Sequence, residues 1–229
     1  MSMMLAGPRQ AVVDCCRRMV ADRLVVGTSG NVSIRAGRRI AVSPTGMAYE
    51  DLTAEDACVV DVKGRVLAGE RTPTSELPMH LTAYQVTGAL AVVHTHSTAA
   101  TAVSTLKETV PNIHYLVAHF GGPVRVAKYA TYGTDELAKA MAEALDGRTG
   151  CLLKNHGTLT VGATVEEAYR GALYLEWLCD IWLRAAAAGE PSLLGDDEIE
   201  TVVAKFRSYG QAETTRRPAS RSRSQGRTA

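Results

Sequence analysis

The chain has 229 residues, a length at which a single core can bury about 70% of the surface exposed by the unfolded chain. Hydrophobic residues make up 46% and charged residues 21% of it, which excludes a largely disordered protein. The 25 basic and 24 acidic residues give a net charge of +1, which argues against nucleic acid or an anionic membrane as the main partner.

The C-terminal segment 214–229 differs from the rest in composition. It contains five arginines and no acidic residue, and without them the remaining 20 basic and 24 acidic residues leave the body at −4. The segment has no apolar periodicity. We therefore predict one domain over residues 1–213 and a disordered basic tail over 214–229. A solvated end is the favoured interpretation of this tail, and an anion-binding arm is the alternative.

The cysteines and the N-terminus indicate a compartment. The five cysteines are an odd number without a CxxC pair, which is typical of free buried thiols in a reducing environment. The start, MSMMLAGPRQ, lacks the charged and apolar regions of a signal peptide, and no stretch approaches the roughly 20 apolar residues of a membrane span. We expect a soluble, cytoplasmic protein.

Hydrophobic periodicity predicts the elements in chain order. A helix with Pro8 in its first turn is expected to run past Leu24 and to end at Gly27. Short strands follow at 32–36, 39–43, 57–62 and 65–69, with Lys63-Gly64 as a hairpin turn. A helix at 76–86 then precedes an apolar strand at 89–96. Further helices are predicted at 97–105, 134–145, 164–187 and 196–208, and a strand–turn–strand at 150–162. This order predicts a single α/β domain with a mixed or mainly antiparallel sheet and flanking helices.

Three histidines at the ends of apolar strands are the most informative residues. Positions two apart on a strand point the same way, so His94 and His96 should emerge together. His156, in the sequence KNHG, also follows an apolar strand. Three imidazoles are a common ligand set for a catalytic zinc ion with an open fourth position. For His80, His114 and His119 a structural or surface role is favoured.

Hydroxyl and glycine clusters predict anion binding. Thr74 or Ser75 is expected to be the N-cap of the helix that carries Glu76 in its first turn, which explains a carboxylate there without any catalysis. The same helix start could instead receive a phosphate beside Glu76 acting as a base. Two more loops, 27–31 with Thr28 and 43–46, have the composition of backbone anion cradles.

These segments together resemble the class II aldolase/adducin family. The similarity lies in GTSGNVS (27–33), SPTGM (43–47), TSELPMH (74–80), VVHTHS (92–97), IHYLVAHFGG (113–122), YATYGTDEL (129–137) and KNHG (154–157), in order and spacing. It extends from about Arg9 to Gln211 and is greatest to the aldolases that cleave L-fuculose 1-phosphate. The resemblance implies a central, mainly antiparallel sheet with helices on both sides, and a cyclic homotetramer with active sites between subunits.

The resemblance also assigns roles. His94, His96 and His156 resemble the ligands of one zinc ion per subunit, and Glu76 resembles both a fourth ligand and the catalytic acid/base. Tyr115 and Tyr209 resemble catalytic tyrosines supplied by a neighbouring subunit. Substrate-binding positions are those that hold the phosphate and the three-carbon enediolate: Thr28, Gly30, Asn31, Thr45, Gly46, Thr74 and Ser75.

The implied reaction is the reversible cleavage of a ketose 1-phosphate, such as L-fuculose 1-phosphate, into dihydroxyacetone phosphate and an aldehyde such as lactaldehyde. Two departures affect the aldehyde side: His119-Phe120 where small residues are expected, and Tyr132 where phenylalanine is expected. The alternatives are a ribulose-5-phosphate 4-epimerase, which would resemble this chain with aspartate at position 76, a methylthioribulose-1-phosphate dehydratase-like enzyme, and a non-catalytic adducin-like module.

Overall fold

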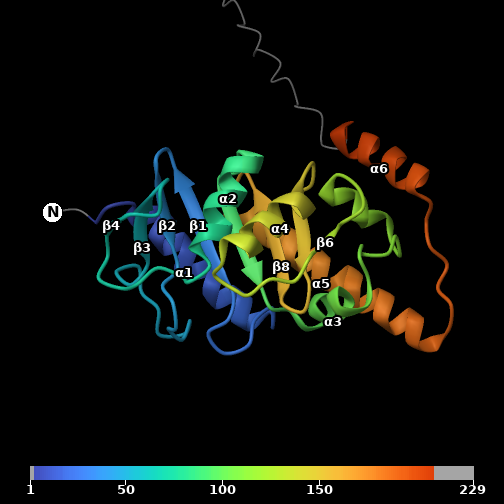
Figure 1. The fold of residues 1–229 in the computed structure, drawn as a ribbon, viewed down its shortest axis with the longest axis horizontal. Coiled ribbons are helices and arrows are strands. Elements are labelled where there is room, and N and C mark those ends of the chain that lie inside the picture. Colours follow the sequence, from blue (N-terminus) through green and yellow to red (C-terminus); the bar gives the residue numbers. More distant parts are fainter. Residues whose placement is uncertain (1–2, 209–229) are drawn as a thin grey trace, which may run out of the picture.

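An eight-stranded sheet forms the centre of the computed structural model, which describes residues 3–208 (Figure 1). Its strand order is β4-β3-β2-β1-β5-β8-β7-β6. The strands are β1 (Asn31–Ala36), β2 (Arg39–Val42), β3 (Cys58–Asp61), β4 (Val66–Ala68), β5 (Ala91–Thr95), β6 (Val126–Ala127), β7 (Gly150–Leu153) and β8 (Gly157–Gly162). All neighbouring strands are antiparallel except β6 and β7, which confirms the predicted, mainly antiparallel sheet.

Helices cover both faces of this sheet. They are α1 (Ala6–Ala21), α2 (Leu77–Thr87), α3 (Thr98–Leu106), α4 (Asp135–Leu145), α5 (Val165–Ala188) and α6 (Asp196–Ser208), with a 3₁₀ helix, η1 (Tyr115–Phe120). Side chains alternate along β2: Ile40 and Val42 pack in the core under α2 and α4, whereas Ala41 packs in the core with α1 and the start of α5. A third core joins α3, η1, α5 and α6.

The middle of the sheet is buried on both sides. Every residue of β5 is buried, and its neighbours in the sheet are β1 and β8. A strand that is buried on both faces has a nearly continuous apolar sequence, and the sequence ALAVV is an example. The polar residues at its end, His94 and Thr95, are therefore delivered into the interior of the domain and not onto an outer surface.

The first helix is shorter than its apolar pattern predicts. α1 ends at Ala21, because Arg23 adopts a left-handed conformation (φ 57°) and the backbone N–H of Leu24 bonds to the carbonyl oxygen of Met19. The expected termination at Gly27 is wrong, although Gly27 does have a positive φ of 61°. Leu24 continues the apolar pattern because it is buried in the same core after the helix has ended.

Two short elements were not expected from the sequence, η1 and the two-residue strand β6. Within residues 3–208 no helix combines the length and the apolar character that crossing a membrane requires. The tail predicted over 214–229 and Tyr209 lie outside the described residues.

Candidate active site

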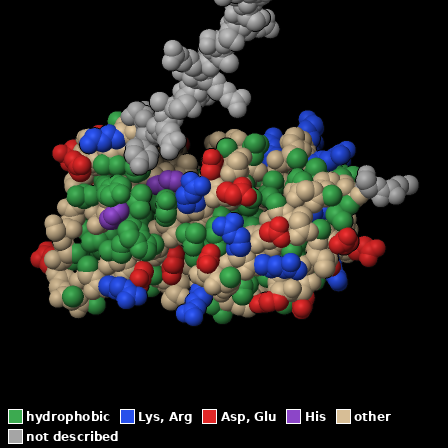
Figure 2. All heavy atoms as spheres, turned by 180° about the vertical axis from the view of Figure 1, so that it is seen from behind, with side chains coloured by type: hydrophobic (Ala, Val, Ile, Leu, Met, Phe, Trp, Pro, Cys, Tyr) green, Lys and Arg blue, Asp and Glu red, His purple; other side chains and the backbone are tan. Residues whose placement is uncertain are grey.

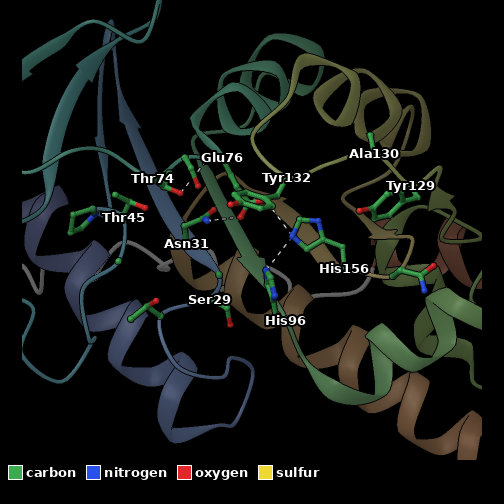
Figure 3. A pocket seen from close by; sticks show the side chains of 16 residues that line it. Ser29, Asn31, Thr45, Thr74, Glu76, His96, Tyr129, Ala130, Tyr132 and His156 are labelled. Carbon is green, nitrogen blue, oxygen red and sulfur yellow. Dashed lines mark hydrogen bonds and ion pairs between the residues drawn. The ribbon is translucent and has the colours of Figure 1, made fainter.

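Three histidines and one glutamate meet at one point of the fold. His94 and His96 come from the end of β5, His156 from the turn between β7 and β8, and Glu76 from the start of α2. Their nearest nitrogen and oxygen atoms all lie within 4.8 Å of one another. Nε2 of His96 is 2.9 Å from Nε2 of His94 and 3.2 Å from Nε2 of His156. The structure thus brings the three histidines together, and Figure 3 shows two of them, His96 and His156, beside Glu76.

A close approach of two strands brings His156 to this point. The following residue, Gly157, begins β8 beside the end of β5, and a Cβ atom there would lie 2.0 Å from the carbonyl oxygen of Thr95. Any other residue would therefore force the strands apart. Asn155, immediately before His156, takes a left-handed conformation (φ 55°), which asparagine tolerates better than most residues.

The donor set fits a divalent metal ion. Nδ1 of His94 lies 2.7 Å from the carbonyl oxygen of Thr158 and donates to it, so in the neutral ring the lone pair of Nε2 faces the cluster. That nitrogen is 3.0 Å from Oε2 of Glu76. Oε1 of Glu76 is buried, lies 3.3 Å from Nε2 of His156 and accepts no hydrogen bond from the described residues. Converging lone pairs and an unsatisfied carboxylate oxygen are the environment that a cation with nitrogen and oxygen ligands requires.

The protonation states of Glu76, His96 and His156 agree with this interpretation, and that of His94 is the exception. Burial lowers the pKa of His96 to about 3 and that of His156 to about 4, with the charge of His94 adding to the effect. Burial raises the pKa of Glu76, but His94, His156 and the hydrogen bond from Asn31 outweigh it and hold that pKa well below its usual range. For His94 the attraction of Glu76 outweighs burial and raises the pKa. An ionised carboxylate and neutral imidazoles are the forms that bind metal.

A cavity of about 340 Å³ opens beside the cluster. All seven positions expected to bind substrate line it: Thr28, Gly30, Asn31, Thr45, Gly46, Thr74 and Ser75. Glu76, His96 and His156 also line it, so the structure brings the three polar loops to one cavity beside the cluster (Figure 3). The loops before β3 and before α2 are joined by a bridge between Pro44 and Pro73.

Both the backbone conformation and the available space require glycine at position 30. Its φ is +75°, and a Cβ atom would lie 2.8 Å from the carbonyl oxygen of His94 and 2.7 Å from a methyl group of Val25. Glycine at this position lets β1 start directly beside the histidine strand. Asn31, the next residue, pairs in register with His94, which places its amide next to Glu76.

Away from the metal cluster, the cavity is rich in hydroxyl groups, and no lysine or arginine among residues 3–208 lines it. Five of the lining residues carry Ser or Thr hydroxyls: Thr28, Ser29, Thr45, Thr74 and Ser75. The N–H groups at the start of α2 are already used: those of Glu76 and Leu77 bond to Thr74, and that of Met79 bonds to the carbonyl oxygen of Glu76. The expectation that Thr74 or Ser75 is the N-cap is wrong: the N-cap is Glu76, whose side chain is turned to the histidines, while its N–H donates to Oγ1 of Thr74 over 3.2 Å.

Several lining residues were missed by sequence reasoning. Tyr129, Ala130 and Asn155 line the cavity, together with Tyr132, which was noted only as a departure. The side chains of Tyr129 and Tyr132 are 64% and 66% exposed at its mouth. Asparagine before His156 was a usable signal, because it is one of the few residues that favour a left-handed turn. The two tyrosines lie in a loop and carry no periodic signal.

Tyr115 lies elsewhere in the chain. It is on η1, 48% exposed, and lines a second cavity together with Tyr174 and Phe206. Hydrophobic side chains gather at the end of the molecule that carries α5 and α6, whereas charged side chains are spread over the other half (Figure 2). His114 caps η1 by accepting from the N–H of Leu116, in line with the structural role expected for it. The structure therefore does not bring Tyr115 to the cavity that the other predicted site residues line.

Comparison with known proteins agrees with the geometry. Residues 10–183 match the model of the "Class II Aldolase and Adducin N-terminal domain" family. The chain is 38% identical over 212 residues to the 5-deoxy-D-ribulose 1-phosphate aldolase of Bacillus thuringiensis serovar kurstaki, covering 91% of this chain and 100% of that one. It is 39% identical to the L-fuculose phosphate aldolase of Escherichia coli over 87% of this chain and 94% of that one.

The fold is similar to that of a solved L-fuculose 1-phosphate aldolase. The TM-score is 0.86 at 37% identity, covering 90% of this chain and 98% of that chain. Class II aldolases depend on a metal ion, and the His/Glu cluster lies where such an ion could bind. The chain belongs to the class II aldolase and adducin family and is an aldolase of that family.

Proposed function

We propose that this protein is a zinc-dependent aldolase that reversibly cleaves a ketose 1-phosphate into dihydroxyacetone phosphate and a short aldehyde. The observation that carries the proposal is the placement of an ionised, buried carboxylate, Glu76, between three imidazoles and a cavity lined with hydroxyls. A proton-transfer group thus stands beside a candidate metal centre and a phosphate-sized polar pocket.

In this proposal His94, His96, His156 and Glu76 hold the zinc ion, one per subunit. When bound, zinc supplies a Lewis acid that polarises the carbonyl of the three-carbon unit and makes its C–H bond acidic. Glu76 takes the proton from carbon in the condensation direction and returns it in cleavage. Its neighbours His94, His156 and Asn31 lower its pKa despite its burial and leave it ionised at neutral pH.

Asn31 and the hydroxyl residues position the substrate. Nδ2 of Asn31 uses one N–H to bond Oε2 of Glu76 over 2.9 Å, so its second N–H remains for an oxygen of the three-carbon unit. Thr45, Thr74 and Ser75 are suited to receive the phosphate, because their hydroxyl groups line the cavity and can donate to its oxygens. Thr28, Gly30 and Gly46 complete the wall of this subsite.

A tyrosine phenol is still needed to protonate the new alkoxide that condensation forms from the aldehyde, and to take that proton back in cleavage. We propose Tyr115 and Tyr209 of a neighbouring subunit for this role. Tyr115 lies outside the cavity of its own chain, is half exposed and lines a second cavity with Tyr174 and Phe206. These observations support a homotetramer with active sites between subunits. A cytoplasmic location and a small sugar phosphate as the partner, without nucleic acid or membrane, complete the proposal.

Two substrates compete within this reaction. L-fuculose 1-phosphate would yield lactaldehyde, and 5-deoxyribulose 1-phosphate would yield acetaldehyde; both types of aldolase are found among the relatives. The difference lies beyond the shared three-carbon unit, at the mouth of the cavity. Tyr129 and Tyr132 stand there, so they are the residues that the aldehyde end would meet.

The other candidate functions have less support. An epimerase would resemble this chain with aspartate in place of Glu76. A dehydratase of the methylthioribulose 1-phosphate type shares the histidines and the phosphate loops and stays as the alternative enzyme. A non-catalytic module has no physical need to bury an unsatisfied carboxylate oxygen among three histidines.

The test is a cleavage assay of the zinc-loaded protein with the two ketose 1-phosphates, in which dihydroxyacetone phosphate and the aldehyde are both measured. Equal amounts of the two products from either substrate support the proposal. Loss of water from 5-methylthioribulose 1-phosphate, without release of a three-carbon product from any of the three compounds, would identify the dehydratase instead.

A further inference from the structure

A row of four buried polar side chains runs from Glu76 into the core. Asn31 donates from Nδ2 to Oε2 of Glu76 over 2.9 Å, and its Oδ1 lies 2.5 Å from Nε2 of His80. Nδ1 of His80 is 2.7 Å from Oγ of Ser33, which is 2.7 Å from the hydroxyl of Tyr84. Their side chains are at most 4% exposed. We call Asn31, His80, Ser33 and Tyr84 the buried relay.

The donor and the acceptor of every hydrogen bond in the relay can be assigned one after another, starting from Glu76. The ionised carboxylate of Glu76 only accepts, so Asn31 must turn its NH₂ group to it and its oxygen to His80. His80 must then donate from Nε2, which leaves Nδ1 of the neutral ring to accept from the hydroxyl of Ser33. That hydroxyl oxygen accepts in turn from Tyr84. Burial lowers the pKa of His80 to about 3, with the charge of His94 adding to the effect, so the ring is neutral as this scheme needs.

Two secondary-structure elements fix the members of the relay. Asn31 and Ser33 are alternate residues of β1 and face the same side. His80 and Tyr84 are one turn apart on α2. The helix that starts at Glu76 therefore also supplies the imidazole that orients the partner of Glu76.

A flipped Asn31 amide would place its oxygen against the carboxylate of Glu76 and its NH₂ group against the N–H of His80. Both contacts would be repulsive, and they cannot be relieved by water in a buried site. Without the N–H of His80 the second contact disappears, and the amide loses the group that fixes its orientation.

We propose that His80 is a positioning residue: its Nε2–H bond to Asn31 Oδ1 holds the amide N–H groups toward Glu76 and the cavity. Oε2 of Glu76 then stays anchored by Asn31, while Oε1, which accepts no hydrogen bond from the described residues, is the oxygen left to exchange protons. This second consequence rests on the proposed function. The orientation of Asn31 and the tautomer of His80 do not.

The kinetic test compares His80→Phe with His80→Gln. Phenylalanine keeps a planar ring but removes the donor, so kcat for cleavage and for deuterium exchange into dihydroxyacetone phosphate should fall about 10–100-fold, with KM changed less than about 3-fold. Glutamine can again donate to Asn31 and should recover most of the loss. Tyr84→Phe removes only the last hydroxyl of the relay and leaves Ser33 able to donate to Nδ1. It should therefore lower kcat the least of the three variants. Equal rates in wild type and His80→Phe, or equal losses in the Phe and Gln variants, would overturn the proposal.

A second readout needs neither activity nor metal. In the metal-free, ¹⁵N-histidine-labelled wild-type protein, a long-range ¹H–¹⁵N correlation spectrum should show His80 neutral and protonated at Nε2. Protonation at Nδ1 alone would leave no N–H for Oδ1 of Asn31 and would refute the proposal even if His80→Phe fails to fold. If the spectrum shows the Nε2 tautomer but the wild type turns over no ketose phosphate, the proposed function is wrong and the orientation of Asn31 still stands.

Discussion

Asn31 and His94 pair in register across the adjacent strands β1 and β5, and both contact the same oxygen of Glu76. Asn31 Nδ2 is 2.9 Å and His94 Nε2 is 3.0 Å from Oε2. The sheet register thus fixes the position of the carboxylate relative to the histidines. Changes in the sheet near this pair should therefore alter metal binding as well as stability.

Removal of one histidine of the cluster should remove the metal. In His96→Ala, one of three imidazole ligand candidates is lost, so the zinc content after dialysis should fall to a small fraction of the wild-type value and cleavage should be abolished. The measurement is metal analysis per subunit of purified protein. His114→Ala, which removes a histidine outside the cavity, is the control and should retain the metal. Full zinc content in His96→Ala would contradict the assignment.

Gly157→Ala tests the close approach that places His156. Because the added Cβ would meet the carbonyl oxygen of Thr95, the free energy of unfolding should fall by about 1–3 kcal/mol or more. The displaced turn should also weaken zinc binding. Gly7→Ala is the matched control, since a Cβ there meets nothing within 4 Å in α1. Denaturant unfolding of both metal-free variants gives the comparison, and equal stability of the two would count against the geometry.

The metal-free protein should lose stability as the pH falls from about 7 to about 4. The pKa values of His96 and His156 are lowered to about 3 and about 4, so below pH 6.5 the unfolded chain binds protons that the folded chain does not. The free energy of unfolding therefore decreases with falling pH in this window. His94 acts in the opposite sense, because its raised pKa stabilises the folded state at low pH.

This pH dependence can be measured by denaturant unfolding in the presence of a chelator. His96→Gln removes one of the imidazoles with a lowered pKa and should flatten the profile. A stability that rises as the pH is lowered from 7 to 5 would show that the histidines are protonated in the folded protein.

Thr45→Val tests the hydroxyl-lined subsite. Valine keeps the shape but removes one hydrogen bond to a charged group, so KM for the ketose 1-phosphate should rise roughly 10-fold with a smaller change in kcat. Thr105→Val, on α3 and outside the cavity, is the control. An unchanged KM in Thr45→Val would exclude this loop from phosphate binding.

The parts of the fold with strong periodicity could be predicted from sequence, and the parts set by tertiary contacts could not. The apolar run before His94 and the alternation in the segment of β2 predicted strands, and both are strands of the sheet. The end of α1 could not be predicted, because Leu24 continues the apolar pattern while Arg23 has already left the helix. η1 and β6 are too short to carry a pattern.

The same division holds in the candidate site. His-x-His and the KNHG turn predicted convergence, because strand ends that meet carry their side chains together. His80 was expected to be merely structural, since a single histidine on a helix gives no sign of its partners. Its contact with Asn31 depends on the packing of α2 against β1. The loop positions of Tyr129 and Tyr132 at the cavity depend likewise on tertiary structure.

Proton NMR of dihydroxyacetone phosphate in deuterated water, with zinc-loaded protein and no aldehyde, tests the central claim most directly. It requires no knowledge of the second substrate. We predict stereospecific loss of one C–H signal, abolished by a chelator and by Glu76→Gln. Persistence of both C–H signals with zinc bound, or undiminished exchange in Glu76→Gln, would contradict the role of Glu76 as the base of a class II aldolase.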